Sequence, residues 1–547
     1  MRVDTVYLPC PVKICPVLEW PQIVDSAKLK AKADPDAAVW IGLDSLTEVD
    51  FLSGGGILGA AVLRVRDSVM LWSRQPDTRM LPASTQKLWT VGAGLSELGP
   101  GFRWRTTLWA QGKVEAGVLH GNLILEGGGD PTLGSGDGPG LMGLANALAK
   151  LGVREVRGNL VAVDTLVGRG PDAWPQGWTI SSSRDGYGAP VLGLNWNQNR
   201  IGDRALLEPR TEALKALRKT LFLKKIAVSG SDTTVKVRGD SLGSRKDWAK
   251  VGVTYSPELD DVARVCLRES VNPYAEAILL GLGTGRGRMA PREAGRKRLL
   301  EWATRKGFEP WRMVLDDGSG LSRYDLVTAR QMARLLGSDL HGRPGARLYD
   351  FMARGGTGTM RNRFKELPDP SVVVAKTGTL DGVANLVGVL SRPGKDTLAF
   401  AFLCGGYLGS ARPVRKFEDR MLALLSGVPL HPLMPSDTAD SSAVRDTSAS
   451  KAVDSLAKPK FAPDTLNPRP PAAKPDSAVV DSLGPRVPAV AAKVVTDSVK
   501  IVPAMAPPRK PSDGPVPGFP PLVPPEAKLP DMRTDTSAPV PGSLFVP

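Results

Sequence analysis

Histidine is scarce in this sequence, with three residues in 547. His120, His341 and His431 all lie far along the chain from any candidate nucleophile, which disfavours mechanisms that use a histidine base. The four cysteines are scattered, and the one close pair, Cys10 and Cys15, has no second pair to complete a zinc site. Runs of about 18 apolar residues are missing too, so we expect no transmembrane segment.

Dense basic runs are also missing, although the net charge is +15. Lysine and arginine are spread along the chain without interleaved aromatic residues, which disfavours nucleic-acid binding and fits attraction to polyanionic surroundings. A secretory leader is not evident in "MRVDTVYLPCPVKICPVLEWPQ", because prolines interrupt its apolar part. This segment predicts either a cytoplasmic protein or an export start that differs from the written one.

The composition changes from about residue 426 onward. All 12 tryptophans and all 7 tyrosines lie before this point, whereas about half of the 48 prolines lie after it. Repeated Asp-Ser or Asp-Thr, Ala and Pro without a helical or strand period cannot bury enough apolar surface to offset chain entropy. We expect a disordered tail, partly polyproline, that acts as a spacer.

Apolar periodicity describes the rest of the chain. An alternating segment around Arg66-Asp67-Ser68 predicts a hairpin, and a helical repeat follows it as far as Gly99-Pro100. Short apolar strands and glycine-rich turns then predict a largely β insertion, after which helices, strands and a closing amphipathic helix follow. Helices with an antiparallel sheet indicate an α+β architecture. The predicted parts are an N-terminal extension of unclear role (1–56), a catalytic domain (57–110 and 256–425), the insertion (111–255) and the tail (426–547).

Ser84 and Lys87, in "LPASTQKLWT", form the first candidate catalytic pair. A spacing of three residues places both on one face of a helix, where a buried lysine with a lowered pKa can accept the serine proton. The spacing alone is a weak signal, because the predicted tail contains it twice, at residues 448–451 and 455–458. An isolated match is more often part of a helix surface.

Two further motifs strengthen the case for Ser84. Ser270 and Asn272 form a Ser-x-Asn motif in a predicted interhelical loop, and Lys376-Thr377-Gly378 follows an apolar strand. A loop serine can relay a proton, an asparagine amide can hold a substrate amide, and a strand glycine admits a second backbone. Each motif alone has a structural explanation, either capping or a place on a strand face. Ser-x-x-Lys, Ser-x-Asn and Lys-Thr-Gly in this order are typical of penicillin-binding proteins and β-lactamases.

From about Gly59 to Leu424 the sequence resembles the D-alanyl-D-alanine carboxypeptidase/endopeptidase family, the low-molecular-mass class C penicillin-binding proteins. The resemblance rests on "LPASTQKLWT", "GNLILEGGGDPTL", "SPELDDVARVCLRESVNPYAEAILL", "LDDGSGLSRYDLVTARQMARLL", "GGTGTMRNRF" and "VVVAKTGTLDGVANLVGVL". It implies a transpeptidase fold of the penicillin-binding-protein/β-lactamase type, interrupted between the first two motifs. A class A β-lactamase has no such long insertion.

The resemblance implies a catalytic role for five motif residues. Ser84 would attack the carbonyl of a D-Ala-D-Ala or D-Ala-diamino acid bond, with Lys87 as its base, and form an acyl-enzyme. Ser270 and Lys376 would pass the proton to the leaving amine, and Asn272 would orient the acyl-side amide. Water would then hydrolyse the ester.

The resemblance also implies how substrate is held. Thr377 and Thr379, on either side of Gly378, would bind the terminal carboxylate with help from the charge of the neighbouring lysine. Backbone N–H groups of Ser84 and Thr379 would form an oxyanion hole, in which each donor is typically worth about 3 kcal/mol. No metal or organic cofactor is implied.

The sequence departs from the family pattern in two places. Val271 replaces the aspartate of a Ser-Asp-Asn motif, and we expect activity to survive because the flanking residues carry the functional groups. After Trp174-Pro175, residues 176–178 lack the acidic side chain that can meet the amino end of a diamino-acid side chain. Asp185 is the possible substitute.

Several nearby residues are expected to be structural. Residues 318–323 predict a tight turn at the rim of the site. Glu276 is expected to form an ion pair or cap behind the site, and Cys266 is expected to belong to the core.

These inferences predict a serine peptidase that acts on peptidoglycan stem peptides, is acylated by β-lactams and works in the periplasm or elsewhere outside the cytoplasmic membrane. A β-lactamase or esterase with the same motifs is one alternative, and rapid β-lactam turnover would favour it. A catalytically decayed peptidoglycan-binding protein is the other, motivated by Val271 and the proline-rich tail.

Overall fold

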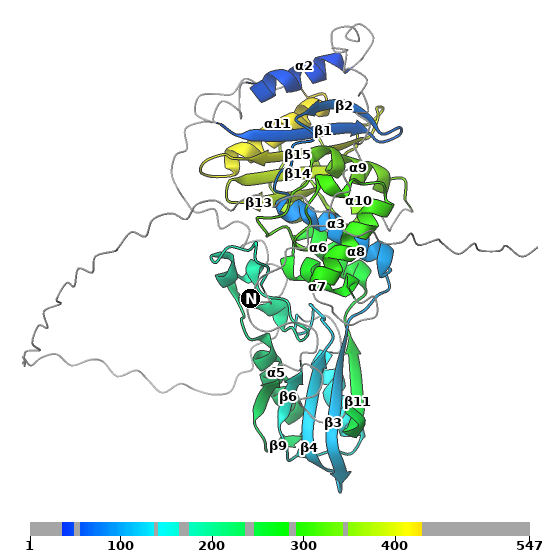
Figure 1. Ribbon diagram of the computed structural model, residues 1–547, viewed down its shortest axis with the longest axis vertical. Coiled ribbons are helices and arrows are strands. Elements are labelled where there is room, and N and C mark those ends of the chain that lie inside the picture. Colours follow the sequence, from blue (N-terminus) through cyan, green and yellow to red (C-terminus); the bar gives the residue numbers. More distant parts are fainter. Residues whose placement is uncertain are drawn as a thin grey trace, which may run out of the picture. The chain divides into compact units, whose positions relative to one another are not determined.

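The computed structural model describes residues 36–48, 55–135, 140–163, 174–235, 245–283, 292–342 and 348–428 (Figure 1). The predicted tail, apart from residues 426–428, and most of the N-terminal extension lie outside the described residues. In the part of the chain that is described, no helix combines the length and apolar character needed to cross a membrane.

A six-stranded sheet forms the centre of the body, with strand order β12-β13-β14-β15-β1-β2. All neighbouring strands in it are antiparallel. The strands are β1 (Ile57–Arg64), β2 (Val69–Arg74), β12 (Ala353–Arg354), β13 (Val373–Leu380), β14 (Val383–Leu390) and β15 (Leu398–Gly405). The hairpin predicted around residue 67 is confirmed as β1 and β2, and β1 pairs with β15 from the far end of the body.

Helices cover both faces of this sheet (Figure 1). Ala61 and Leu63 of β1 face one core cluster, whereas Ala60 and Val62 face the other, as strand alternation requires. The second cluster contains α2 (Ala37–Leu46) and α11 (Arg412–Leu425). The first contains α3 (Lys87–Glu97), α6 (Leu259–Arg268), α7 (Asn272–Leu282), α8 (Arg292–Arg305), α9 (Ala329–Asp339) and α10 (Leu348–Phe351).

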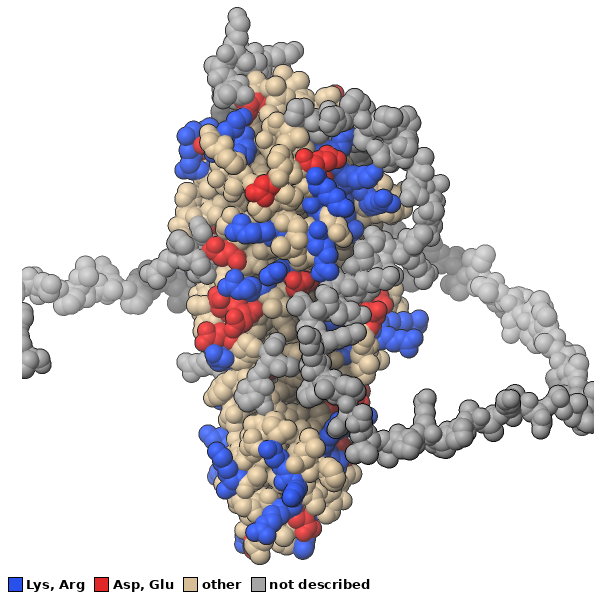
Figure 2. All heavy atoms as spheres, turned by 180° about the vertical axis from the view of Figure 1, so that it is seen from behind, with Lys and Arg blue, Asp and Glu red and all other residues tan. Residues whose placement is uncertain are grey.

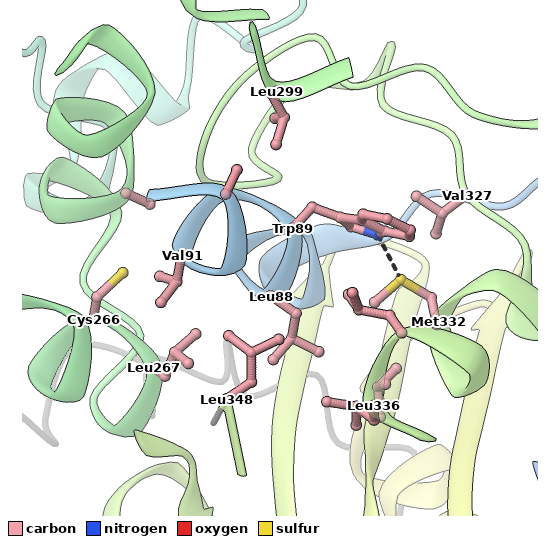
Figure 3. Packing of buried hydrophobic residues seen from close by; sticks show 14 of the residues in the cluster. Leu88, Trp89, Val91, Cys266, Leu267, Leu299, Val327, Met332, Leu336 and Leu348 are labelled. Carbon is pink, nitrogen blue, oxygen red and sulfur yellow. Dashed lines mark hydrogen bonds between the residues drawn. The ribbon is translucent and has the colours of Figure 1, made fainter. Parts of the chain in front are cut away.

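Helix α3 lies at the centre of the first cluster (Figure 3). Leu88, Trp89 and Val91 are fully buried, and the Trp89 indole donates a hydrogen bond to the sulfur of Met332. Cys266 packs in the same cluster, which confirms its expected place in the core. The first turn of the helix, which carries the candidate base, is therefore held by packing on all sides.

The insertion has its own seven-stranded sheet, with β10-β6-β4-β3-β11 in line, β5 paired with β4 and β9 paired with β5. The strands are β3 (Arg105–Glu115), β4 (Val118–Gly127), β5 (Glu155–Val156), β6 (Leu160–Val163), β9 (Ala227–Val228), β10 (Asp232–Val235) and β11 (Trp248–Tyr255). A two-stranded sheet of β7 (Arg200–Ile201) and β8 (Arg204–Ala205) lies outside this sheet.

Two helices in the insertion, α4 (Gly140–Lys150) and α5 (Pro209–Leu223), were not part of the sequence prediction. Leucines at helical spacing along both helices pack on the sheet. A glycine-rich segment before α4 obscured this signal there, whereas the leucine repeat of α5 was a signal that the prediction did not use. The predicted boundary between residues 110 and 111 falls inside β3, so we place the start of the insertion at Arg105.

The surface mixes charges of both signs. On the face shown in Figure 2, basic and acidic side chains lie next to one another over the described surface. Ion pairs contribute to this mixture, such as Arg330 with Asp77 at 2.8 Å and Arg218 with Asp232 at 2.6 Å. The charge distribution matches the dispersed lysine and arginine residues of the sequence.

Candidate active site

Ser84 lies in a short 3₁₀ helix, Ala83–Gln86, directly before α3. The preceding segment is held by Asn385 of β14, whose Nδ2 donates to the carbonyl oxygens of Leu81 at 2.9 Å and Pro82 at 2.8 Å. This amide ties the serine to the central sheet, so the position of the hydroxyl follows from the sheet as well as from α3.

Lys87 is the first residue of α3, and its side chain is fully buried. Its Nζ donates to Ser84 Oγ at 2.8 Å, Asn272 Oδ1 at 2.6 Å and the carbonyl oxygen of Ser319 at 2.8 Å. Burial disfavours the ammonium form and lowers the pKa of Lys87 to about 8. Loss of one proton leaves a lone pair on Nζ, next to the serine hydroxyl, that can accept the serine proton.

Lys376 lies on β13 and is also fully buried. Its Nζ donates to Ser270 Oγ at 2.8 Å and to the carbonyl oxygen of Thr377 at 2.9 Å. Burial, followed by the charge of Lys87, holds the pKa of Lys376 well below its usual value. Two lysines, each bonded to a serine hydroxyl, therefore belong to one site.

The second motif lies between α6 and α7. Ser270 is in the connecting loop with a φ of 63°, in the left-handed region that is strained for a residue with a side chain. Asn272 is the first residue of α7 and donates from Nδ2 to the carbonyl oxygen of Tyr187 at 2.9 Å. Val271 packs against the core cluster around α3, so an apolar side chain suits this position.

The third motif is part of β13, where side chains alternate between the two faces. Thr377 donates from Oγ1 to Thr359 Oγ1 at 3.0 Å, and the exposed Thr379 accepts from Arg415 Nη2 at 3.4 Å. A Cβ added to Gly378 would lie 2.7 Å from the Pro82 carbonyl oxygen and 3.2 Å from the Ser84 nitrogen. Glycine at this position allows the strand to pass directly beside the serine.

The turn at residues 317–322 lies behind Lys87. Glu276 accepts a hydrogen bond from the Gly318 N–H at 3.0 Å and forms an ion pair with Arg292, which confirms its expected role. A Cβ added to Gly320, which has a φ of +81°, would lie 1.7 Å from the carbonyl oxygen of Ala83. The predicted tight turn therefore contacts the serine segment itself.

Asp185 comes from the insertion. It precedes a short 3₁₀ helix, Gly186–Gly188, and its carboxylate is bonded to the Tyr187 hydroxyl. Burial, followed by this bond, raises the pKa of Tyr187 to about 12. Because the Tyr187 carbonyl accepts from Asn272, Asp185 lies near the second motif. Across the described ranges, His, Cys, Asp and Glu side chains form no group of three that could hold a metal ion.

A family model described as "D-Ala-D-Ala carboxypeptidase 3 (S13) family" matches residues 42–206 and 202–427. The chain belongs to this family. It is 28% identical over 445 residues to the D-alanyl-D-alanine carboxypeptidase of Actinomadura sp. (strain R39), over 68% of this chain and 81% of that protein. It is 24% identical over 431 residues to the D-alanyl-D-alanine carboxypeptidase DacB of Haemophilus influenzae, over 67% of this chain and 88% of that protein.

Among solved structures, the fold matches penicillin binding protein 4 (dacB) from Haemophilus influenzae with a TM-score of 0.62 and 22% identity, over 70% of this chain and 99% of that one. The family resemblance and the α+β transpeptidase-like fold that the sequence predicts are therefore confirmed. The expected enzyme class, a serine-type D-Ala-D-Ala peptidase, follows from membership in the S13 family.

The sequence reading missed three residues that hold the motifs of this S13 chain in place. Asn385 fixes the serine segment, Asp317 organises the turn behind Lys87, and Trp178 donates from its indole to Asp317 at 2.7 Å. An aspartate before Gly-Ser-Gly is a known turn signal, so Asp317 had a signal in the sequence. The other two act across more than 100 positions of the chain, and no local pattern marks them.

Proposed function

We propose that this protein hydrolyses the peptide bond that follows D-alanine in peptidoglycan stem peptides or cross-links, through an ester on Ser84. The observation that carries the proposal is the buried Lys87, whose Nζ lies 2.8 Å from Ser84 Oγ and whose pKa is lowered to about 8. A base is most effective when its pKa is close to the working pH, because it is then both available and basic enough.

The reaction starts when Lys87 accepts the Ser84 proton as Oγ attacks the carbonyl carbon of the D-alanine residue. Backbone N–H groups of Ser84 and Thr379 stabilise the negative oxygen of the tetrahedral intermediate. Ser270 passes its hydroxyl proton to the leaving amine and takes one from Lys376, whose Nζ lies 2.8 Å from Ser270 Oγ, and the C–N bond breaks. A water molecule then adds to the ester, and the C–O bond to Ser84 breaks as the hydroxyl regains its proton.

The third motif binds the carboxylate end of the substrate. Thr377 and Thr379 offer hydroxyl groups, and Gly378 between them keeps the strand close to the serine. The guanidinium of Arg415, 3.4 Å from Thr379 Oγ1, adds a positive charge on the same side of the strand. Asn272, held by Lys87 and the Tyr187 carbonyl, orients the amide on the acyl side.

Asp185 is the proposed partner for the amino end of a diamino-acid side chain. Its position two residues from Tyr187 places it beside the part of the site that Asn272 forms. Asp185→Asn is expected to raise the KM for a peptide with a free side-chain amine about tenfold and to leave an N-acetylated peptide unchanged. Equal effects on both peptides would contradict this assignment.

β-Lactams are proposed as covalent inhibitors that form the same ester with Ser84. Peptidoglycan as substrate places the proposed activity outside the cytoplasmic membrane. A labelled penicillin that stays on Ser84 for many minutes supports a penicillin-binding peptidase, whereas rapid nitrocefin turnover supports a β-lactamase.

Mass spectrometry of muropeptides digested by wild type and by Ser84→Ala tests the proposal. Loss of terminal D-alanine with wild type alone supports a carboxypeptidase, and loss of cross-linked dimers supports an endopeptidase. Ser455→Ala, which alters a Ser-x-x-Lys match in the predicted tail, is the control and should digest as wild type does. Identical product patterns from wild type and Ser84→Ala would sink the proposal.

A further inference from the structure

One buried carboxylate organises the turn behind Lys87. Asp317 Oδ1 accepts the N–H groups of Ser319 at 3.0 Å and Gly320 at 2.5 Å, and Oδ2 accepts those of Leu321 at 3.0 Å and Ser322 at 2.8 Å. A carboxylate that accepts several backbone N–H bonds holds them strongly, because each bond is charge-assisted. The path of the turn backbone therefore depends on a single side chain.

This turn contacts both members of the Ser-x-x-Lys motif. The Ser319 carbonyl oxygen accepts from Lys87 Nζ at 2.8 Å, and Gly320 packs against Ala83, directly before Ser84. Thr90 of α3 also donates to the Gly318 carbonyl oxygen at 2.7 Å. A shift of the turn therefore shifts the ammonium relative to the serine hydroxyl.

A further donor reaches Asp317 from the insertion, besides the four turn N–H groups and the Ser319 hydroxyl, whose Oγ lies 3.4 Å from Oδ2. The indole Nε1–H of Trp178 lies 2.7 Å from Asp317 Oδ2, and the Trp178 side chain is 9% exposed. The preceding Gly177 accepts the Arg323 N–H at 2.8 Å, and a Cβ added to Gly177 would lie 1.9 Å from Ser322 Oγ. Residues 177 and 178 therefore dock tightly on the turn.

We propose that Trp178 is a positioning residue for Lys87, acting through Asp317 and the Ser319 carbonyl. The inference rests on the proposed role of Lys87 as the base. The indole N–H binds Oδ2 of the carboxylate together with two of the turn N–H groups, and the other two turn N–H groups bind Oδ1. The insertion thereby helps to fix where the lysine amine points. An insertion whose own core is apolar thereby takes part in acylation without touching the substrate.

Charged and titratable groups face Lys87 from several elements. Burial is the main influence on its pKa, and the acidic groups around it oppose that fall. The acidic groups are Cys266 from α6, Asp317 and Asp325 from the turn region and Glu276 from α7. Lys376 from β13 is the second basic group of the site, and its pKa is lowered by burial and then by the charge of Lys87.

Trp178→Phe tests the inference, because it keeps an aromatic ring and removes the N–H donor. We expect the rate constant of acylation by a fluorescent penicillin to fall about tenfold and its non-covalent Kd to stay within about twofold. Trp109→Phe is the matched control, since it removes an indole bond to Glu126 on the insertion sheet, at 2.9 Å, and should acylate as wild type does. The first-order rate constant of labelling measures how fast the folded molecules react. The labelling amplitude measures what fraction of the molecules is folded.

A double-mutant cycle with Asp317→Asn distinguishes an effect of Trp178 on the position of Lys87 through Asp317 from a general loss of packing around the site. Asp317→Asn should lower acylation more than Trp178→Phe does, and adding Trp178→Phe to it should change the rate by less than about twofold. Loss of the Asp317 charge should also move the midpoint of the pH profile to lower pH, because this charge raises the pKa of Lys87.

An acylation rate constant for Trp178→Phe equal to that of wild type would overturn the inference. So would full additivity of the two substitutions' effects on this rate constant in the cycle. A lower labelling amplitude with an unchanged rate constant would do the same, because it reports folding alone. If labelling does not require Ser84 at all, the proposed function fails, whereas Ser84-dependent labelling with a wild-type rate in Trp178→Phe overturns the positioning role only.

Discussion

The two large sheets of this protein are surrounded by different kinds of buried side chain. Among the described residues around the catalytic sheet, eight charged residues are buried, namely Asp36, Lys87, Glu276, Asp317, Asp325, Lys376, Arg392 and Glu418. The insertion sheet packs through a cluster of aliphatic side chains. Among its described residues, Asp130 and Arg210 are the buried charged ones.

This difference indicates that buried groups serve stability in the insertion core and chemistry in the catalytic body. Burying a charge costs free energy unless partners compensate for it, so such groups accumulate where a perturbed pKa is used. The insertion contributes to the site through a segment outside its sheet, by the Trp178 indole and the Tyr187 carbonyl. Its core can therefore be optimised for packing, while the body keeps costly polar groups.

Removing the buried base is expected to have the largest effect. Lys87→Met should lower the acylation rate constant about 10³-fold, because it removes the amine that is hydrogen-bonded to Ser84 Oγ and takes its proton. Lys113→Met, which changes an exposed lysine of the insertion sheet, is the control and should leave the rate unchanged. The measurement is stopped-flow labelling with a fluorescent penicillin. A wild-type rate for Lys87→Met would show that the buried charge around the catalytic sheet is not used for chemistry.

A methyl group beside the serine is the next strongest change. Gly378→Ala places a Cβ 2.7 Å from the Pro82 carbonyl oxygen and 3.2 Å from the Ser84 nitrogen, so β13 or the serine segment must move. A displacement of this kind should lower acylation about 10²-fold. The control is Gly101→Ala, because a Cβ there meets nothing within 4 Å. Equal rates for the two variants would show that the close approach is unnecessary.

Buried titratable groups in the two regions should affect the pH dependence of the acylation rate differently. Lys87 acts as a base when it is neutral, so acylation should rise about tenfold per pH unit below its pKa of about 8 and level off above it. Burial raises the pKa of Asp130 in the insertion to about 6, yet Asp130→Asn should leave the profile unchanged. Labelling rates between about pH 6 and pH 9 test both statements, and a profile without a limb near pH 8 contradicts the assignment of the base.

Core truncations should give the smallest change in acylation. Leu88→Ala in α3 and Leu217→Ala in α5 each remove a fully buried leucine, and each should lower the free energy of unfolding by about 2–5 kcal/mol. Acylation should fall a few-fold in Leu88→Ala alone, because this residue follows Lys87. Denaturant titration and labelling kinetics measure the two effects, and a matching fall in Leu217→Ala would couple the insertion core to the site.

Local patterns predicted much of the molecule. The three motifs, the hairpin of β1 and β2, and the helix after Ser84 follow from residue spacing, because each depends on neighbours a few positions apart. Helix α4 was missed since the glycine-rich segment before it outweighed its leucine repeat, whereas the leucine repeat of α5 was a signal that the prediction did not use. The contacts of Asn385 and Trp178 were missed because their partners lie far away in the chain, up to 304 positions for Asn385 and Leu81.

The sequence by itself determined which functional groups are present and in what order, since Ser84 and Lys87 meet through a spacing of three residues. Only the tertiary structure decided that Lys87 is buried and has a pKa of about 8. Its other two hydrogen-bond partners, Asn272 and Ser319, are 185 and 232 positions away. Desolvation and Coulomb interactions depend on distance in space, and only the folded chain sets that distance.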